Sequence, residues 1–179
     1  RVAGLDLLSP PGGFAAGRLD DGTAILLDLF DDLAPPRRVL DLACGCGPLG
    51  LAALARWREA IAHLADDDAD AVAAARVNAE ANGLAARCAV QWWTAGEALS
   101  VGGFDLALVN PPCHVGAEVD AGVGQAVLAA AAAALVPGGR LLAVANRRLP
   151  YEAALQRFGA VRQVVQSGGY KVLELVVPA

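Results

Sequence analysis

One segment carries most of the information about the fold, and it reads Val39-Leu40-Asp41-Leu42-Ala43-Cys44-Gly45-Cys46-Gly47-Pro48-Leu49-Gly50. The apolar residues at its start predict a buried strand. The residues from Pro48 to Ala60 predict a helix, with the proline well placed in the first turn. The glycines between them let the backbone pass close to a ligand in front of a helix N-terminus. The segment therefore predicts a strand, a tight turn and a helix.

The same alternation continues along the chain. An amphipathic helix over 25–33 precedes the segment, helices are expected over 70–81, 122–135 and 149–158, and strands over 61–65, 88–92, 104–109 and 140–145. Two final strands over 160–166 and 170–177 form a hairpin, which makes the last strand antiparallel. Strands that alternate with helices require a mostly parallel sheet with helices on both faces. We therefore predict a Rossmann-like, doubly wound α/β fold.

Composition describes one domain over residues 1–179, since the chain has 56% hydrophobic residues and neither a repeat nor a linker. The longest apolar stretch, 126–136, is too short to cross a bilayer. The four cysteines are scattered and no pair has C-x-x-C spacing, so we expect no metal site and a cytoplasmic location. A further domain upstream of Arg1 is left open.

Charge is unevenly spread along the chain. The net charge of −5 argues against nonspecific RNA binding by bulk electrostatics. Residues 137–179 nevertheless hold six basic side chains against two acidic ones, which are either a local basic face or ordinary solvated charges. The six basic residues are Arg140, Arg147, Arg148, Arg157, Arg162 and Lys171.

Two acids close the first two strands of the pattern. Gly45 to Gly50 satisfies G-x-G-x-x-G, a spacing that dinucleotide enzymes and S-adenosylmethionine (SAM) methyltransferases share. A carboxylate at Asp41 would repel a pyrophosphate and attract an ammonium group, which favours SAM. Asp66 is placed to accept hydrogen bonds from both ribose hydroxyls.

The most specific feature is Asn110-Pro111-Pro112-Cys113-His114, directly after the fourth strand. Ligands of open α/β sheets bind at this carboxyl edge. The prolines remove two N–H donors, which leaves carbonyl acceptors beside the Asn110 amide. Such acceptors would hold both hydrogens of an amine and aim its lone pair at a methyl donor, without a strong base.

With these residues the chain resembles the catalytic domain of the small-subunit ribosomal RNA guanine-N2 methyltransferases, within the Rossmann-like SAM-dependent methyltransferases. The Asn-Pro-Pro segment is shared with adenine-N6 and glutamine-N5 methyltransferases, whereas the start and the end of the chain are similar to the guanine-N2 group. The matching blocks are Phe14 to Thr23, Asp41 to Gly50, Asn110 to His114, Val144-Ala145-Asn146, Leu149-Pro150-Tyr151 and Gly168 to Val172.

The resemblance implies a seven-stranded sheet with a reversed last strand, residues 1–23 over the cofactor site, and ribosomal RNA or the small subunit as partner. It places the methionine part of SAM on Asp41 and the Gly45 and Gly47 backbone, and the ribose on Asp66. Asn110 with the Pro111 carbonyl would hold the target amine. The remaining residues it implies are Thr23, Ala43, Ala95 and again Asn110 for the cofactor, Pro112 for catalysis, and Cys113 and His114 for the substrate.

Three positions depart from the family pattern. Ala43 replaces a loop glycine, Ala95 stands where Asp or Asn usually meets the adenine amine, and Cys113 replaces an aromatic residue that stacks on the target base. Trp92 or Trp93 could supply the missing ring, although a core role is favoured for both. Neither a His114 base nor a Cys113 nucleophile is well motivated.

These departures leave alternative functions open. One alternative is methylation of adenine N6 or of a protein glutamine, and a second is a noncatalytic domain that binds SAM or RNA. A nicotinamide-dependent oxidoreductase is disfavoured by Asp41 and by Asn110 to Pro112.

Overall fold

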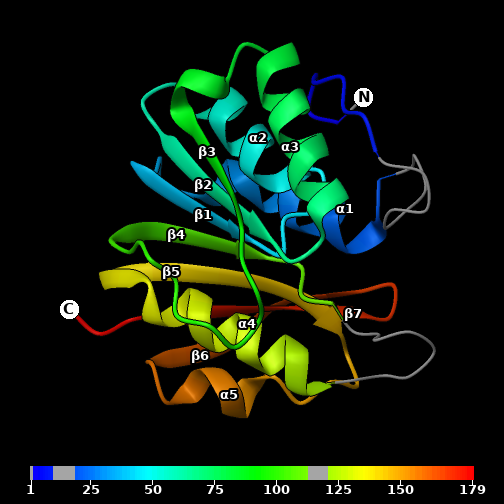
Figure 1. Ribbon diagram of the computed structural model, residues 1–179. Coiled ribbons are helices and arrows are strands. Elements are labelled where there is room, and N and C mark those ends of the chain that lie inside the picture. The colour runs from blue at the N-terminus through cyan, green and yellow to red at the C-terminus, as the bar shows by residue number, and fades with distance from the viewer. Residues whose placement is uncertain (1, 10–18, 113–120) are drawn as a thin grey trace.

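In the computed structural model, residues 2–9, 19–112 and 121–179 are described, and they form a seven-stranded sheet flanked by helices (Figure 1). The strands are β1 (Arg38–Leu42), β2 (Ile61–Asp66), β3 (Cys88–Trp92), β4 (Phe104–Val109), β5 (Leu135–Asn146), β6 (Ala160–Ser167) and β7 (Tyr170–Val176). The helices are α1 (Asp21–Asp28), α2 (Pro48–Arg56), α3 (Ala69–Ala81), α4 (Ala121–Ala133) and α5 (Glu152–Gln156), with short 3-10 helices η1 (Leu29–Asp32) and η2 (Ala85–Arg87).

The strand order is β3-β2-β1-β4-β5-β7-β6, and the first five strands are parallel to one another. Strand β7 lies between β5 and β6 and is antiparallel to both. The chain reverses at Gly168 and Gly169, which both have positive φ and so connect β6 to β7 at little steric cost. The predicted fold class and the reversed last strand are confirmed.

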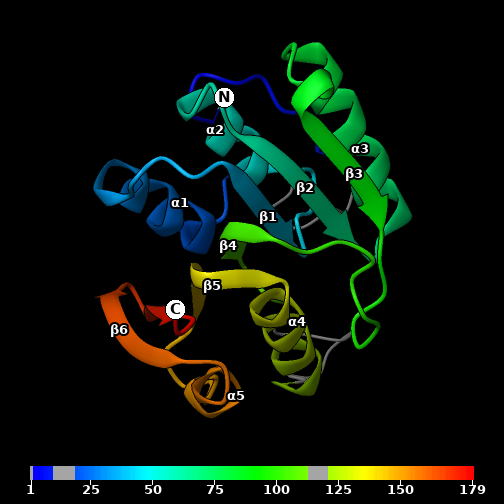
Figure 2. The ribbon, with the colours of Figure 1, turned by 90° about the vertical axis from the view of Figure 1, so that its left-hand side faces the viewer.

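Helices cover both faces of the sheet (Figure 2). One core cluster holds the buried side chains of α1, α2 and α3, among them Leu26, Leu51 and Ala75. The other holds those of α4 and α5, such as Leu128 and Leu155. Because alternate residues of a strand point to opposite faces, each central strand contributes to both clusters, which explains its nearly continuous apolar sequence.

Several predicted helix boundaries are wrong. The helix expected over 25–33 is α1 (Asp21–Asp28) followed by η1, and the helix expected over 48–60 ends at Arg56. The helix expected over 122–135 ends at Ala133, and β5 begins at Leu135 and runs through Pro137-Gly138-Gly139. Gly138 donates to the carbonyl oxygen of Val177, and Val177 donates to that of Gly139, so tertiary pairing keeps this stretch in the sheet. The helix expected over 149–158 is confined to Glu152–Gln156.

Candidate functional site

The candidate site lies at the carboxyl edge of the sheet, where β2, β1 and β4 end side by side. From β1 the chain proceeds to β2 on one side, and β4 is the neighbour on the other side, so this edge is a topological switch point. The acid at the end of β2, the glycine loop after β1 and the asparagine after β4 therefore meet there. The tertiary structure brings together Asp66, Gly45 and Asn110.

The loop after β1 has a left-handed backbone at three positions. The φ angles are 60° at Ala43, 55° at Gly45 and 88° at Gly47. A side chain at Gly47 would place its Cβ 2.9 Å from Leu64 in β2, whereas a Cβ at Gly45 would meet nothing within 4 Å. The left-handed φ at Gly47, together with the close approach of Leu64, favours glycine there, and a Cβ at Gly45 would face open space.

Asp41 lies beneath this loop and is buried. Its Oδ2 accepts a hydrogen bond from the backbone N–H of Gly50 at 2.7 Å, which ties the end of β1 to the first turn of α2. Burial raises the pKa of the Asp41 carboxyl to about 7; the Gly50 bond opposes this shift and the nearby Asp66 charge adds to it. In this structure Asp41 organises the loop, and its contact with a ligand ammonium stays a prediction.

Asp66 ends β2 and supports the loop from the other side. Its Oδ2 accepts from Gly45 N–H at 2.7 Å and its Oδ1 from Asp68 N–H at 3.0 Å. Desolvation raises the pKa of this carboxyl, while those two backbone bonds lower it. Each oxygen accepts one of these backbone bonds and has capacity for a second, so the pair can still accept from a diol.

Asn110 follows β4 and is held by α1, 90 residues earlier in the chain. Its Nδ2 donates to Asp20 Oδ2 at 2.5 Å and to Thr23 Oγ1 at 3.1 Å. The Thr23 hydroxyl in turn donates to Asp20 at 3.1 Å, so its hydrogen points to Asp20 and not to a ligand. The cofactor contact expected of Thr23 stays a prediction.

The segment after Asn110 packs on α4. A Cβ at Gly124 would lie 2.1 Å from Tyr151 Oη and 3.3 Å from the Pro112 carbonyl oxygen. Only glycine allows the buried Tyr151 ring and the Pro112 backbone to approach the helix this closely. The Pro112 carbonyl is therefore directed to α4, and the Pro111 carbonyl is the better candidate for a substrate acceptor.

Sequence reasoning missed two positioning residues, Asp20 and Asn78. Asn78 is fully buried in α3, and its Nδ2 donates to the carbonyl oxygens of Leu8 and Cys46, at 2.9 Å each. A signal was present, because Asn78 falls on the same helical stripe as Ala71 and Ala75 and is the one polar residue among them. A buried polar side chain needs such partners.

The two tryptophans have different environments. Trp93 is buried in the core cluster, as expected, and donates from Nε1 to the Glu97 carbonyl. The core role expected of Trp92 is wrong: its side chain is 58% exposed, and its Nε1 donates to the Asp67 carbonyl beside Asp66. Ala95 is half-buried and packs on the same cluster as Trp93. Cys113 and His114 lie outside the described residues.

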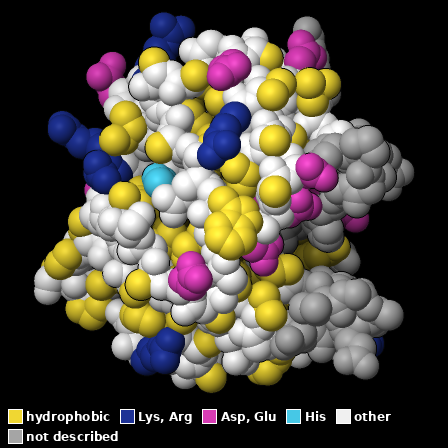
Figure 3. All heavy atoms as spheres, viewed as in Figure 1, with side chains coloured by type: hydrophobic (Ala, Val, Ile, Leu, Met, Phe, Trp, Pro, Cys, Tyr) yellow, Lys and Arg dark blue, Asp and Glu magenta, His cyan; other side chains and the backbone are white. Residues whose placement is uncertain are grey.

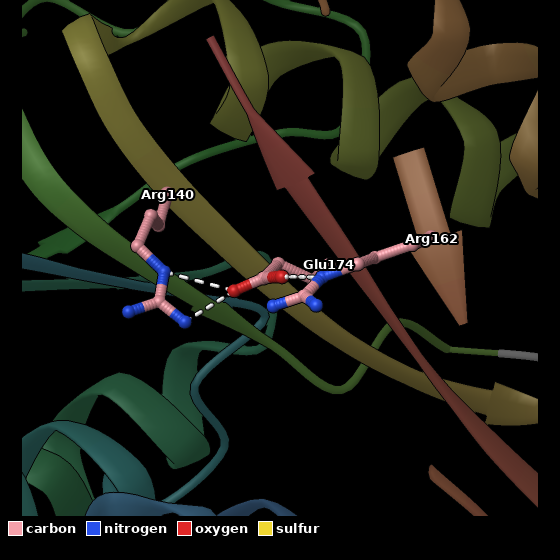
Figure 4. A network of polar contacts seen from close by, with 3 residues as sticks. All are labelled: Arg140, Arg162 and Glu174. Atoms are coloured by element: carbon pink, nitrogen blue, oxygen red, sulfur yellow. Dashed lines mark hydrogen bonds and ion pairs between the residues drawn. The ribbon is translucent and has the colours of Figure 1, made fainter. Parts of the chain in front are cut away.

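The basic residues of 137–179 do not form one face. Arg140 and Arg162 both bind the buried carboxylate of Glu174 at the amino edge of the sheet (Figure 4). Burial alone would raise the pKa of Glu174, but these two guanidinium groups hold it below its ordinary value. Lys171 is buried and donates to Glu152 at 2.5 Å. On the face shown in Figure 3, basic and acidic side chains are interspersed.

Arg147 and Arg148 make no side-chain ion pair of this kind with any residue that the structure describes. They are exposed in the turn after β5, at the same edge of the sheet as Asn110. Arg147 N–H donates to the Gly169 carbonyl at 2.9 Å and Arg148 N–H to Asn146 Oδ1 at 3.0 Å, which fixes the turn.

In the described part of the chain, no His, Cys, Asp or Glu group could hold a metal ion. Within the same residues, no helix has the length and apolarity that a membrane span requires.

The sheet order, the glycine loop and the acids at the strand ends define this chain as a Rossmann-like methyltransferase. It belongs to the methyltransferase small domain family, whose pattern it matches over residues 4–174. It is 38% identical to "Ribosomal RNA small subunit methyltransferase C" of Hahella chejuensis over 177 residues, 98% of this chain and 51% of that protein. The protein of that name from Chromohalobacter salexigens is 39% identical, over 98% of this chain and 52% of its own length.

Solved structures of methyltransferases have the same fold as this chain. The T. thermophilus 16S rRNA N2 G1207 methyltransferase, in complex with AdoMet and guanosine, superposes with a TM-score of 0.81 and 34% identity, over 94% of this chain and 46% of that one. A Pyrococcus furiosus methyltransferase superposes with a TM-score of 0.72 over 98% of this chain and 90% of its own, and at 17% identity it supports the fold alone. The chain spans about half the length of the curated relatives it matches.

Proposed function

We propose that this chain is the SAM-dependent catalytic domain of an enzyme that methylates the exocyclic N2 amine of a guanine in small-subunit ribosomal RNA. The observation that carries the proposal is the position of Asn110-Pro111-Pro112, directly after β4 and beside the glycine loop. The names of the similar proteins and the guanosine complex of the T. thermophilus enzyme support the choice of substrate. Residues 1–179 would act as a single cytoplasmic domain with ribosomal RNA as partner.

The residues at the edge of the sheet fit SAM. Gly45 leaves space where a ligand would approach the loop, and the Asp66 carboxylate can accept further bonds from ribose hydroxyls. Burial raises the pKa of both Asp41 and Asp66, so a cation beside them would relieve an unfavourable pair of carboxylates. A pyrophosphate would add to their repulsion, which disfavours a dinucleotide. We assign Asp41, Ala43, Gly45, Gly47, Asp66, Ala95 and Thr23 to this pocket.

When bound, SAM supplies a methyl group on a positively charged sulfur. Asn110 Oδ1 and the Pro111 carbonyl would accept the two hydrogens of the target amine and hold its lone pair toward that methyl group. Transfer would form a nitrogen–carbon bond in place of the carbon–sulfur bond, and the amine would release its proton to solvent afterwards. No described residue has to act as a strong base.

The RNA would approach over the end of β5. The acids Asp66, Asp67 and Asp68 lie at the β2 end of the edge and would repel phosphates, whereas Arg147 and Arg148 at the β5 end would attract them. The target base would thus enter beside Asn110 from the basic end.

The test compares Asn110→Ala with the wild-type chain and with Asn82→Ala, a variant of the asparagine at the C-cap of α3. Methyl transfer from labelled SAM is measured on small subunits that lack the modification, on adenine-containing DNA and on a glutamine peptide. We expect transfer to guanine N2 in the subunits alone, its loss in Asn110→Ala, and SAM affinity within about threefold of wild type. Transfer to another substrate, or an equal loss of SAM binding, would refute the assignment.

A further inference from the structure

We propose that Asp20 is a positioning residue that determines which end of the Asn110 carboxamide faces the target amine, an inference that rests on the proposed function. Asp20 Oδ2 accepts from Asn110 Nδ2 at 2.5 Å. A carboxylate oxygen accepts hydrogen bonds and cannot donate, so the amide nitrogen must face Asp20 and the amide oxygen must face away. The orientation of Asn110 is therefore set by a residue on another element.

Both hydrogens of the Asn110 amide are used inside the protein. The second is donated to Thr23 Oγ1 at 3.1 Å. An amide nitrogen has two hydrogens and no acceptor capacity, so the substrate meets Oδ1 alone. The group presented at the end of β4 is then a pure acceptor, which matches an amine and does not match a carbonyl or a ring nitrogen that has no hydrogen.

The charge of Asp20 also strengthens this acceptor. A hydrogen bond from an amide N–H to a carboxylate polarises the amide and increases the negative charge on its oxygen. Oδ1 should hold an amine hydrogen more tightly as a result. A neutral partner for Nδ2 would fix the orientation with less polarisation.

Asp20 is itself held in place. It is the N-cap of α1, and the same Oδ2 accepts from Thr23 N–H at 2.8 Å and from the Thr23 hydroxyl. The first turn of α1 packs on β5, where a Cβ at Gly22 would lie 3.1 Å from the Val144 side chain. The carboxylate therefore has little room to move, and α1 transmits its position to Asn110.

Three variants separate positioning from a merely structural role. Asp20→Ser keeps a good N-cap but is too short to reach Asn110, and Asp20→Asn keeps both the cap and an acceptor oxygen. Asp21→Ser is the matched control, because Asp21 is the next residue, is exposed and lies in the same helical turn.

The first readout is the preference of the nucleoside site for guanosine over inosine, which lacks the 2-amino group, measured by competition. We expect a preference of about fivefold or more in wild type and in Asp21→Ser, and of less than about twofold in Asp20→Ser. The kcat of methyl transfer should fall about 10- to 100-fold in Asp20→Ser and recover to within about fivefold in Asp20→Asn, with SAM affinity within about threefold of wild type because both residues still cap Thr23 N–H. Equal behaviour of Asp20→Ser and Asp21→Ser would overturn the inference, as would a parallel loss of SAM affinity.

The second readout needs no substrate. Hydrogen exchange of the Asn110 side-chain amide, assigned by its absence in Asn110→Ala, should be slow in wild type and at least about tenfold faster in Asp20→Ser. Unchanged exchange would overturn the inference. Slow exchange together with no methylation by the wild-type chain would count against the proposed function and not against the orientation of Asn110.

Discussion

Asn78 Nδ2 donates to the carbonyl oxygen of Cys46 in the glycine loop after β1, although the two residues are 32 positions apart. The same nitrogen donates to the Leu8 carbonyl, and Asn78 Oδ1 accepts from Leu8 N–H at 2.7 Å. One fully buried side chain thus joins the N-terminal segment, α3 and the loop after β1. This bridge therefore adds to the Asp41 and Asp66 bonds that hold the loop.

Replacing Asn78 with alanine should lower the free energy of unfolding by about 2–4 kcal/mol, because three part-buried hydrogen bonds to the backbone of Leu8 and Cys46 are lost from a fully buried position. It should also weaken SAM binding, since the loop loses its tie to α3. The matched control is Asn82→Ala, which removes the exposed bonds to Asp6 and one part-buried bond to the Asn78 carbonyl oxygen and should cost about 1 kcal/mol. Urea unfolding and calorimetric titration test both effects, and equal costs for the two variants would contradict the bridging role.

Ala43 has a φ of 60°, a conformation that costs an alanine roughly 1–2 kcal/mol relative to glycine. Ala43→Gly should therefore raise the free energy of unfolding by about 0.5–1 kcal/mol after the entropy of glycine is counted. Ala3, with a φ of 48°, is the control outside the site. Ala3→Gly should stabilise the chain without changing SAM affinity, whereas Ala43→Gly should also tighten SAM binding. Urea unfolding measures the stability of the two variants, and calorimetric titration measures their SAM affinity. A lower free energy of unfolding for Ala43→Gly than for wild type would contradict the prediction.

Asp41 makes stability depend on pH. Its pKa is raised from 3.8 to about 7 in the folded chain, so between these values the folded state binds a proton that the unfolded state has lost. The free energy of unfolding should then fall as the pH rises from about 4 to about 7, by on the order of 2–4 kcal/mol. Asp41→Asn keeps an acceptor for Gly50 N–H and should remove this contribution. Denaturant unfolding at several pH values measures it, and parallel profiles for the two proteins would rule it out.

Arg147 and Arg148 should contribute to RNA affinity through phosphate contacts. The double variant Arg147→Ala/Arg148→Ala should reduce the slope of log K against log salt concentration by about 1–2 and leave SAM affinity unchanged. Arg157→Ala is the control, since Arg157 is exposed but stacks on Phe158 near α5. Filter binding of small-subunit RNA across salt concentrations provides the measurement. An equal change in slope for Arg157→Ala would argue against a specific basic end.

Much of the site was predictable because its parts are local in sequence. A strand, a glycine turn and a helix with Pro48 in its first turn follow from residues within one segment, and the structure agrees. The assignment of Asn110 to the carboxyl edge needed no more than the strand before it. The boundary of β5 was wrong because Leu135 to Gly139 is kept in the sheet by β4 and by Val177, which lie far away in sequence.

The amino-acid sequence by itself therefore determined the alternation of strands and helices, the glycine loop and the chemical types at each strand end, since all of these depend on neighbouring residues. Folding alone determined the partners of those groups. Asp20 accepts a hydrogen bond from Asn110, and Asn78 donates one to the Cys46 carbonyl. Glu174 forms ion pairs with Arg140 and Arg162, which the composition alone cannot distinguish from unpaired basic residues. Such contacts join segments up to 90 residues apart, and their geometry exists only once the sheet has brought the elements together.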